Sequence, residues 1–540
     1  MLDIKIINGK IIDGTGKERY RADIGIKGNK IIKIGKIEED AEKIIDAENK
    51  LVCPGFIDIH THSDVSVIYD RCASSKIRDG VTSEVIGNCG IAVAPILEEK
   101  KDYLLKYLAT RLIGSIPVEL KLPWNTLDEY FDFIDNTPPA VNIIPLLAQG
   151  VVRINEMDFS KAAPTDEQLN NMKKIVNESM KAGTFAITSG LVYLPGDYTS
   201  TEELIELCKE VKKYNGYYTT HMRTESDGIF EALEEAITIA EKSEIPLHIS
   251  HLKIAGLKNR GKTDQLLQRI EKAQADGLDV TFDVYPYDAG LTSLSSLLPP
   301  WGFEGGVEKL IERLREKEIR EQMREDIKTG IKGWQNSIST LGSWDEVVIA
   351  SVFNEESHLL EGKSIREIAE MWKKDPLETV FDIVQKEKGR VQVILKRMSE
   401  NDVREIIKHP LAMVCSDAMS LSETGILSQG KPHPRAFGSH ARVISKYARD
   451  LNLFSIEDAI KKMTSMPANR LGLKNRGILA EDYYADITII DLEEIEDRAT
   501  YANPKQYSKG IDTVIVNGKI ALINDEETKE FSGVVLKRGE

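Results

Sequence analysis

The feature that most constrains the fold of this 540-residue chain is a regular alternation of short apolar strands with amphipathic helical segments through its middle. Eight runs are predicted as strands, at 54–62, 82–89, 141–148, 184–193, 216–223, 246–253, 279–287 and 411–418. Helical segments lie between most of them, and several end in glycine, which is a common helix stop signal. Eight alternating strand–helix units predict an α/β fold, a (β/α)8 TIM-like barrel.

The two ends of the chain have a different character. Residues 1–55 and 474–540 contain short strand-like runs that Gly, Asn and Asp interrupt, which predicts one small β-sandwich domain formed from both termini. The barrel would then occupy 56–473. The interval of about 290–405 between the last two predicted strands is too long for one crossover and is rich in Glu and Lys, so we expect an inserted helical subdomain there.

Unusual polar residues stand where the predicted strands end. They are His60 and His62 after the first strand, Cys89 after the second, His221 after the fifth, His251 after the sixth and Asp417 after the eighth. Active sites of such barrels form at the C-terminal ends of the strands. The sequence therefore predicts that these side chains meet at one mouth of the barrel.

Their chemistry favours a catalytic metal site. His60 and His62 are two residues apart and share a face, whereas His248, three before His251, should face the outer helices as a structural residue. Imidazole and thiolate are zinc ligands, and zinc-bound water becomes available as hydroxide at neutral pH. A carboxylate such as Asp417 could relay its proton. Taken singly, Cys89 could equally be a small buried side chain and Asp417 a capping residue.

Charge and cysteine content limit the function classes. The net charge of −16 argues against nucleic acid or an anionic membrane as the main partner. The N-terminus MLDIKIINGK lacks the apolar core of a signal peptide, and no run reaches the length of a transmembrane helix. The five cysteines are odd in number and widely spaced, unlike a disulfide framework. We therefore expect a cytoplasmic location.

Several motifs carry a family resemblance. PGFIDIHTHSD at 54–64 is similar to the metal-binding opening of the amidohydrolase superfamily. The chain resembles more narrowly the N-acyl-D-amino-acid deacylases, or D-aminoacylases. The motifs that carry this resemblance are GNCG at 87–90, TSGLVYLPG at 188–196, THMRTES at 220–226, ISHLKIAG at 249–256, YPY at 285–287, KPHPRAFGSHARV at 431–443 and the segment 463–491.

The resemblance implies the barrel with its small β-domain and a zinc-dependent activity. It implies hydrolysis of N-acyl-D-amino acids to a carboxylate and a free D-amino acid. One zinc would be held tightly by Cys89, His221 and His251, and a second, weaker metal position would lie near His60 and His62. Asp417 would act as the catalytic base and acid. The fourth strand has no lysine, unlike the hydantoinase and dihydroorotase pattern in which a carboxylated lysine bridges two metals.

The resemblance also implies a small-molecule substrate whose α-carboxylate needs a basic group and a hydroxyl near the metal. Lys253 and Tyr285 are the first candidates, with Tyr193 and Arg223 behind them. Arg223 could instead form a structural ion pair with Glu225 or a neighbour. Arg435, in the loop after the last strand, is a further candidate.

Two alternatives stay open. An amidohydrolase that acts on cyclic amides or dipeptides would keep the zinc and change the pocket. GLKNRGKT at 256–263 fits the P-loop pattern of nucleotide-binding proteins and follows a predicted strand. That loop carries bulky residues at 258–260, however, and a P-loop NTPase would leave the histidines and the cysteine unexplained.

Overall fold

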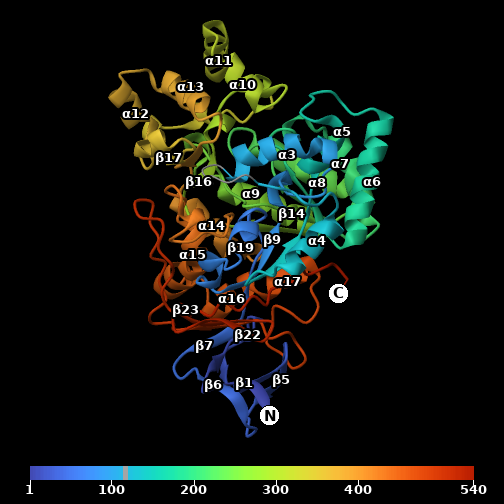
Figure 1. Ribbon diagram of the computed structural model, residues 1–540, viewed down its shortest axis with the longest axis vertical. Helices are drawn as coiled ribbons and strands as arrows, with labels where there is room; N and C mark the ends of the chain where they lie inside the picture. The colour runs from blue at the N-terminus through green and yellow to red at the C-terminus, as the bar shows by residue number, and fades with distance from the viewer. Residues whose placement is uncertain (114–119, 540) are drawn as a thin grey trace.

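A barrel of parallel strands forms the centre of the molecule in the computed structural model, which describes residues 1–113 and 120–539 (Figure 1). Two parallel sheets, β8-β9-β10 and β11-β12-β13-β14-β15-β19, make up its wall, and a parallel bridge between Thr61 and Ala418 joins its first and last strands. The strands are β8 (Phe56–Asp58), β9 (Val81–Ile86), β10 (Asn142–Pro145), β11 (Leu147–Ala148), β12 (Ala186–Gly190), β13 (Tyr217–His221), β14 (Leu247–Ile249), β15 (Val280–Val284) and β19 (Ala412–Val414). Because β10 and β11 are successive parts of one run, the wall has eight strand positions, and the predicted α/β barrel is confirmed.

Helices cover the outside of the barrel, as their sequences predict. They include α6 (Asp166–Ala182), α7 (Thr201–Lys212), α8 (Ile229–Ser243) and α9 (Thr263–Ala275). Helix α6 begins at a capping box in which Thr165 and Gln168 bond each other's backbone amides, and it ends at Gly183 in the left-handed conformation. No helix in the described ranges has both the length and the apolar character needed to cross a membrane.

Strands from both ends of the chain pack together below the barrel (Figure 1). The first sheet has the order β5-β4-β1-β6 and the second β23-β22-β21-β20-β7-β2-β3. Their bounds are β1 (Leu2–Ile7), β2 (Lys10–Ile11), β3 (Tyr20–Arg21), β4 (Asp23–Lys27), β5 (Lys30–Gly35), β6 (Ala41–Asp46), β7 (Leu51–Pro54), β20 (Ile487–Ile490), β21 (Ile511–Val516), β22 (Lys519–Ile523) and β23 (Glu526–Glu527). A buried cluster made mostly of isoleucines joins the two sheets. We propose that the segments 1–55 and 474–540 form one domain on this basis.

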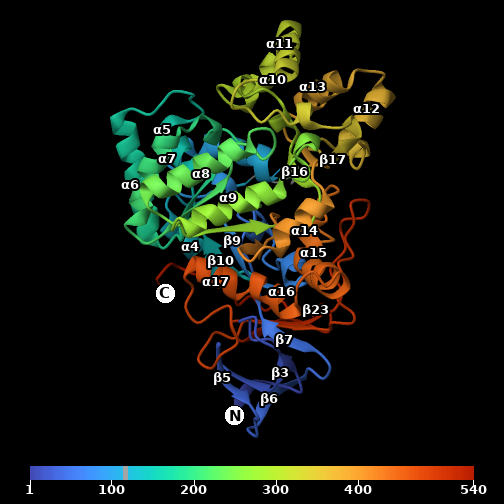
Figure 2. The same ribbon diagram turned by 180° about the vertical axis from the view of Figure 1, so that it is seen from behind.

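The segment between β15 and β19 forms a separate body at the opposite end of the barrel from the N-terminal sheet (Figures 1 and 2). It contains α10 (Val307–Arg313), α11 (Lys317–Thr329), α12 (Ile365–Trp372) and α13 (Pro376–Lys386). It is not purely helical, because β16 (Gly290–Ser293), β18 (Gln392–Leu395) and β17 (Val347–Ser351) form an antiparallel sheet. These strands are only four or five residues long and pair with distant segments. The next helix, α14 (Glu400–Lys408), packs on α9 and β19 and belongs to the barrel.

The segment that fits the P-loop pattern is a barrel loop whose polar groups bond to the protein itself. The Gly256 amide donates to the Arg397 carbonyl. The Gly261 amide and the Thr263 hydroxyl both donate to Asp402 Oδ1, at 3.2 and 2.7 Å. Three donors of the loop that a phosphate could use are therefore already engaged within the protein.

Candidate metal centre

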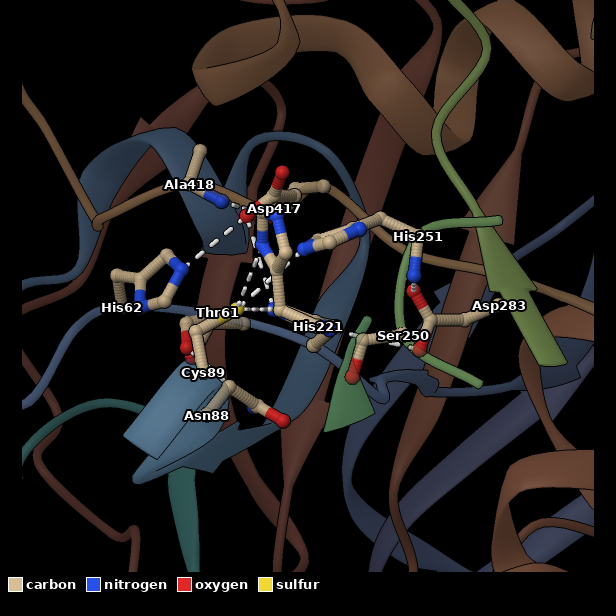
Figure 3. Close-up of polar contacts among 12 residues, drawn as sticks. Thr61, His62, Asn88, Cys89, His221, Ser250, His251, Asp283, Asp417 and Ala418 are labelled. Atoms are coloured by element: carbon tan, nitrogen blue, oxygen red, sulfur yellow. Dashed lines mark hydrogen bonds and ion pairs between the residues drawn. The ribbon is translucent and has the colours of Figure 1, made fainter. Parts of the chain in front are cut away.

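The predicted site residues meet at the ends of the barrel strands because the backbone turns sharply there. Cys89, His251 and Asp417 have φ values of +54°, +33° and +50°, in the left-handed region that non-glycine residues rarely adopt. Each such conformation costs about 1–3 kcal/mol and persists only where its surroundings impose it. The turns direct the three side chains toward one centre, where His62 and His221 join them (Figure 3).

Close backbone packing holds the turn that carries Cys89. This turn is a single 3-10 turn, η1 (Asn88–Gly90). A Cβ atom on Gly190 of β12 would clash with the Cys89 carbonyl oxygen, so only glycine allows β12 to approach this closely. The Gly90 amide also donates to Thr188 Oγ1 at 3.0 Å. The thiol is thereby fixed at the floor of the barrel mouth.

The side chains form a set of donors suited to zinc. Cys89 Sγ lies 3.3 Å from His251 Nε2, 3.8 Å from His221 Nδ1 and 3.3 Å from His60 Nε2. Asp417 Oδ1 lies 3.1 Å from His62 Nε2 and 3.6 Å from His60 Nε2. One thiol and several imidazoles, almost all buried, at these separations match the donor types of a zinc site. Among the described residues, three groups could each hold a metal ion: His60, Cys89 and His251; His60, His62 and Asp417; and His221, Glu225 and His251.

The electrostatics of the centre favour charged ligands. Burial alone would raise the pKa of the Cys89 thiol, but the His60 and His251 imidazoles lower that pKa well below its usual value. Burial would also raise the pKa of Asp417, yet Arg435 and His251 lower it well below the ordinary carboxyl value. These contacts favour the thiolate form of Cys89 and the carboxylate form of Asp417.

Two buried carboxylates orient the histidines from outside the centre. Asp283 of β15 accepts the His251 amide through Oδ1 at 2.7 Å, and its Oδ2 lies 2.8 Å from His248 Nε2 and 3.4 Å from His60 Nδ1. Glu225 Oε1 lies 3.0 Å from His251 Nδ1. Such partners set the tautomer of a metal-ligating histidine and raise its basicity.

Neither carboxylate was predicted to belong to the site, and Glu225 was considered only as an ion-pair partner of Arg223. Asp283 stands two residues before Tyr285 in a predicted strand, so strand alternation could have placed it on the same face. Glu225 follows the end of β13 in irregular backbone, where no periodicity applies.

The expectation for His248 is corrected. We expected His248 to face the outer helices, but its ring contacts Asp283 and lies 6.3 Å from the Tyr217 ring, centroid to centroid, inside the barrel wall. The reason is that β14 ends at Ile249 and the chain turns at His251. Strand alternation therefore does not extend from position 248 to position 251.

The pocket above the metal centre contains four of the five predicted substrate contacts: Tyr193, Lys253, Tyr285 and Arg435. Arg435 is already engaged, because its Nη1 donates to Asp417 Oδ2 at 2.6 Å. Lys253 Nζ lies 2.5 Å from Glu225 Oε1. Arg435 therefore positions Asp417, and Lys253 contacts the partner of His251.

Arg223 does not line this pocket, which corrects its assignment as a substrate contact. Its guanidinium binds Glu235 of α8 at 2.8 and 2.9 Å and donates to the carbonyl oxygens of Asp197 and Thr199. Arg223 therefore forms the structural ion pair that was considered as the alternative, with Glu235 and not Glu225 as its partner.

Two arginines that the sequence analysis did not single out also line the pocket. Arg397 comes from the insertion, directly after β18, and donates to Ser337 Oγ at 2.9 Å. Burial lowers the pKa of its guanidinium. Arg111 comes from the short π-helix η3 (Ala109–Ile113). Neither position belongs to a recognisable motif, so the sequence offered no signal for them.

Comparison with known proteins agrees with this geometry over the whole chain. The model of the amidohydrolase family matches residues 43–522. D-aminoacylase of Alcaligenes xylosoxydans xylosoxydans is 32% identical over 537 residues, which cover 99% of this chain and 98% of that protein.

Two solved structures are also similar over their full length. A D-aminoacylase structure that addresses the role of a binuclear metal centre is 30% identical, with a TM-score of 0.81 and 100% of both chains covered. N-acyl-D-glutamate deacylase from Bordetella bronchiseptica, in complex with zinc and a phosphonate mimic of the tetrahedral intermediate, is 28% identical, with a TM-score of 0.82 and 99% of both chains covered. From the fold, the buried donor set and these full-length matches, we conclude that the chain belongs to the amidohydrolase family and, within it, to the D-aminoacylase group.

Proposed function

We propose that this chain is a zinc-dependent hydrolase that cleaves the amide bond of N-acyl-D-amino acids, releasing a carboxylate and a free D-amino acid. The observation that carries the proposal is the position of the Asp417 carboxylate, 3.1 Å from His62 Nε2 at the floor of a pocket that also contains the guanidinium groups of Arg111 and Arg397. The names of the full-length relatives support the substrate class.

The resemblance to the D-aminoacylases implies which residues would hold zinc, and the distances within the centre are compatible with that set. Cys89, His221 and His251 would bind one ion, and His60 and His62 would bind a second, weaker one. Zinc bound there would polarise the acyl carbonyl and make a water molecule more acidic. Asp283 and Glu225 would keep the imidazole nitrogens oriented toward the metal. Strand β12, with the sequence AITSG, has no lysine that could bridge two ions as a carbamate.

Asp417 would move the proton in this reaction. Its Oδ2 is held by Arg435, and its Oδ1 is directed toward His60 and His62. Arg435 and His251 lower the pKa of Asp417 and keep its carboxylate ionised, and an ionised carboxylate has the oxygen that could accept a proton from the attacking water. The same oxygen would then deliver that proton to the leaving amine.

The α-carboxylate of the substrate would bind on the side of the pocket that carries Lys253, Tyr285 and Arg397. Lys253 lies 5.4 Å from the centroid of the Tyr285 ring. The Arg397 guanidinium donates to the Ser337 hydroxyl, and no carboxylate in the described ranges lies within 4.0 Å of it. A guanidinium group with free N–H donors matches a carboxylate in two-point geometry.

The direct test uses zinc-loaded protein with paired N-acetyl-D- and N-acetyl-L-amino acids, and measures the free amine released. Protein treated with a chelator is the control. We expect metal-dependent release from the D series alone. Stoichiometric zinc without release from either series would reject the deacylase assignment and favour an amidohydrolase acting on cyclic amides or dipeptides, which would then be assayed as substrates.

A further inference from the structure

The pocket contains more positive charge than the α-carboxylate of a substrate requires. Four cationic side chains line it: Arg111, Lys253, Arg397 and Arg435. Glu225 pairs with Lys253, and Asp417 pairs with Arg435. For Arg111 and Arg397, no carboxylate of the described ranges lies within ion-pair distance. If Arg397 receives the α-carboxylate, Arg111 still lacks an anionic partner.

Arg111 is placed beside the reaction centre. Its guanidinium carbon lies 3.4 Å from the centroid of the Tyr193 ring, and that ring meets the His221 imidazole edge-on with centroids 4.9 Å apart. A single aromatic ring therefore separates Arg111 from a metal-ligating histidine. Stacking fixes the plane of the guanidinium and leaves its edge donors free for a ligand. Its buried Nε has no hydrogen-bond partner among the described residues.

Hydroxyl groups of the insertion accompany Arg111 in the pocket. Thr292 of β16 and Ser296 both line it, and their hydroxyl oxygens are 3.2 Å apart. The insertion sheet is also tied to the backbone of η3, because Gln392 Nε2 donates to the Thr110 carbonyl at 3.2 Å. The barrel segment with the free guanidinium and the insertion strand with the hydroxyls thus face one space.

We infer that Arg111, together with Thr292 and Ser296, forms a second carboxylate subsite. The preferred substrates are then N-acyl-D-amino acids with a second carboxylate, either in the amino-acid side chain or in the acyl group. Holding an unpaired guanidinium in a partly buried pocket is unfavourable, and a substrate carboxylate supplies the missing charge-assisted hydrogen bonds. This inference rests on the proposed function and narrows it.

The first experiment compares charged and neutral substrates of matched shape on the zinc-loaded wild-type protein. One arm pairs N-acetyl-D-glutamate with N-acetyl-D-glutamine, and the other pairs N-succinyl-D-leucine with N-succinamoyl-D-leucine. A preference of about 10- to 100-fold in kcat/KM for the charged member is expected in one arm, and that arm identifies the source of the carboxylate. Equal values within both pairs would overturn the inference.

Calorimetric binding of the same four compounds separates this inference from the proposed function. If none is hydrolysed and N-acetyl-D-leucine is also untouched, the proposed function fails. Tighter binding of the charged member of a pair would still support the subsite, and equal binding within both pairs would still overturn it.

The second experiment assigns the preference to Arg111. In Arg111→Met, the ratio of charged to neutral kcat/KM is expected to fall by about tenfold or more. The matched control is Lys106→Gln, which removes a positive charge from the neighbouring helix α3 (Lys101–Leu108) outside this pocket and should keep the wild-type ratio. Circular dichroism and zinc content verify the fold of each variant.

Two outcomes would contradict the role of Arg111. An equal loss for both members of a pair would show that Arg111 binds the α-carboxylate, and an unchanged ratio would show that it binds neither group. If Arg111→Met does not fold, Arg111→Lys replaces it, because lysine keeps the charge but loses the planar fork and should lower the same ratio less.

Discussion

Asp283→Asn tests whether a buried carboxylate next to the metal centre sets the tautomer and orientation of the histidines that would bind zinc. Asp283 accepts hydrogen bonds on both oxygens, from the His251 amide on one side and from His248 on the other, where His60 Nδ1 is also 3.4 Å away. Asparagine has one acceptor oxygen and one NH2 group. If its oxygen keeps the His251 amide, its NH2 group faces His60 Nδ1. That nitrogen can then no longer donate, so the ring proton moves to Nε2, the atom directed at Cys89.

The magnitude follows from these contacts. A change in the partner that orients a ligand histidine typically costs about 10- to 100-fold in metal affinity. The loss of the charge-assisted hydrogen bonds to His248 and His60 also lowers the free energy of unfolding by about 3–6 kcal/mol, at about 1.5–3 kcal/mol for each of the two. We therefore expect Asp283→Asn to fold at 25 °C with a lower melting temperature and with clearly weaker zinc binding at the second metal position, where His60 would be a ligand.

Competition with a chromophoric chelator measures zinc affinity directly, and thermal unfolding of the zinc-free protein measures stability. Asp79→Asn is the matched control, because Asp79 is also a buried carboxylate that accepts from a histidine, His440, but lies outside the metal centre. This control should lose stability and keep its zinc affinity. The role of Asp283 is refuted if Asp283→Asn binds zinc at the second position as tightly as wild type, or if both variants weaken zinc binding equally.

Three further predictions follow from the site and its surroundings. Asp417→Asn should retain zinc, because the asparagine oxygen can still accept a hydrogen bond from Arg435. It should lower kcat by about 10²- to 10⁴-fold, the usual contribution of general acid–base catalysis, and near-normal turnover with zinc bound would reject the role of Asp417. Cys89→Ser should weaken zinc binding by more than the roughly 10- to 100-fold that is expected when a residue that only orients a ligand is changed. An unchanged affinity in the chelator competition would exclude the thiolate as a ligand. Burial raises the pKa of Asp197 to about 6, although Arg223 is near. Between about pH 4 and 6 the native state therefore binds more protons than the unfolded state, and ionisation of Asp197 destabilises the native state as the pH rises. Relative to wild type, Asp197→Asn should therefore be more stable at pH 7.5 than at pH 4, by about 2–3 kcal/mol in the free energy of unfolding. Melting temperatures of both proteins at the two pH values measure this, and a difference between the proteins that does not change with pH would contradict it.

Local patterns were sufficient to predict much of the barrel and its metal centre. Strand alternation and glycine-terminated helices are properties of short segments, and the eight predicted strand positions match β8 to β15 and β19. The ligand types stand at strand ends, which a parallel barrel necessarily brings to one mouth. For this reason Cys89, His221, His251 and Asp417 could be grouped before any contact was known.

Exceptions to these patterns arise where the backbone leaves regular geometry. His248 was expected on the outer face because alternation was extended beyond the end of β14, where His251 adopts a left-handed conformation. The insertion was expected to be helical because it is long and rich in Glu and Lys. Its sheet was not predicted, since β16, β17 and β18 are very short and pair with one another across long stretches of chain. A local window contains neither the turn nor the pairing partner.

The sequence alone determined the fold class, the strand ends that carry ligands and the type of metal chemistry, because these depend on residue type and short-range periodicity. Only the tertiary structure decided which charges are paired. Glu235 engages Arg223 and Asp417 engages Arg435, whereas Arg397 and Arg111 remain without a carboxylate in the described part of the pocket. Pairing depends on distances between segments far apart in the chain, and those distances are set by how the insertion and the barrel loops pack around one cavity.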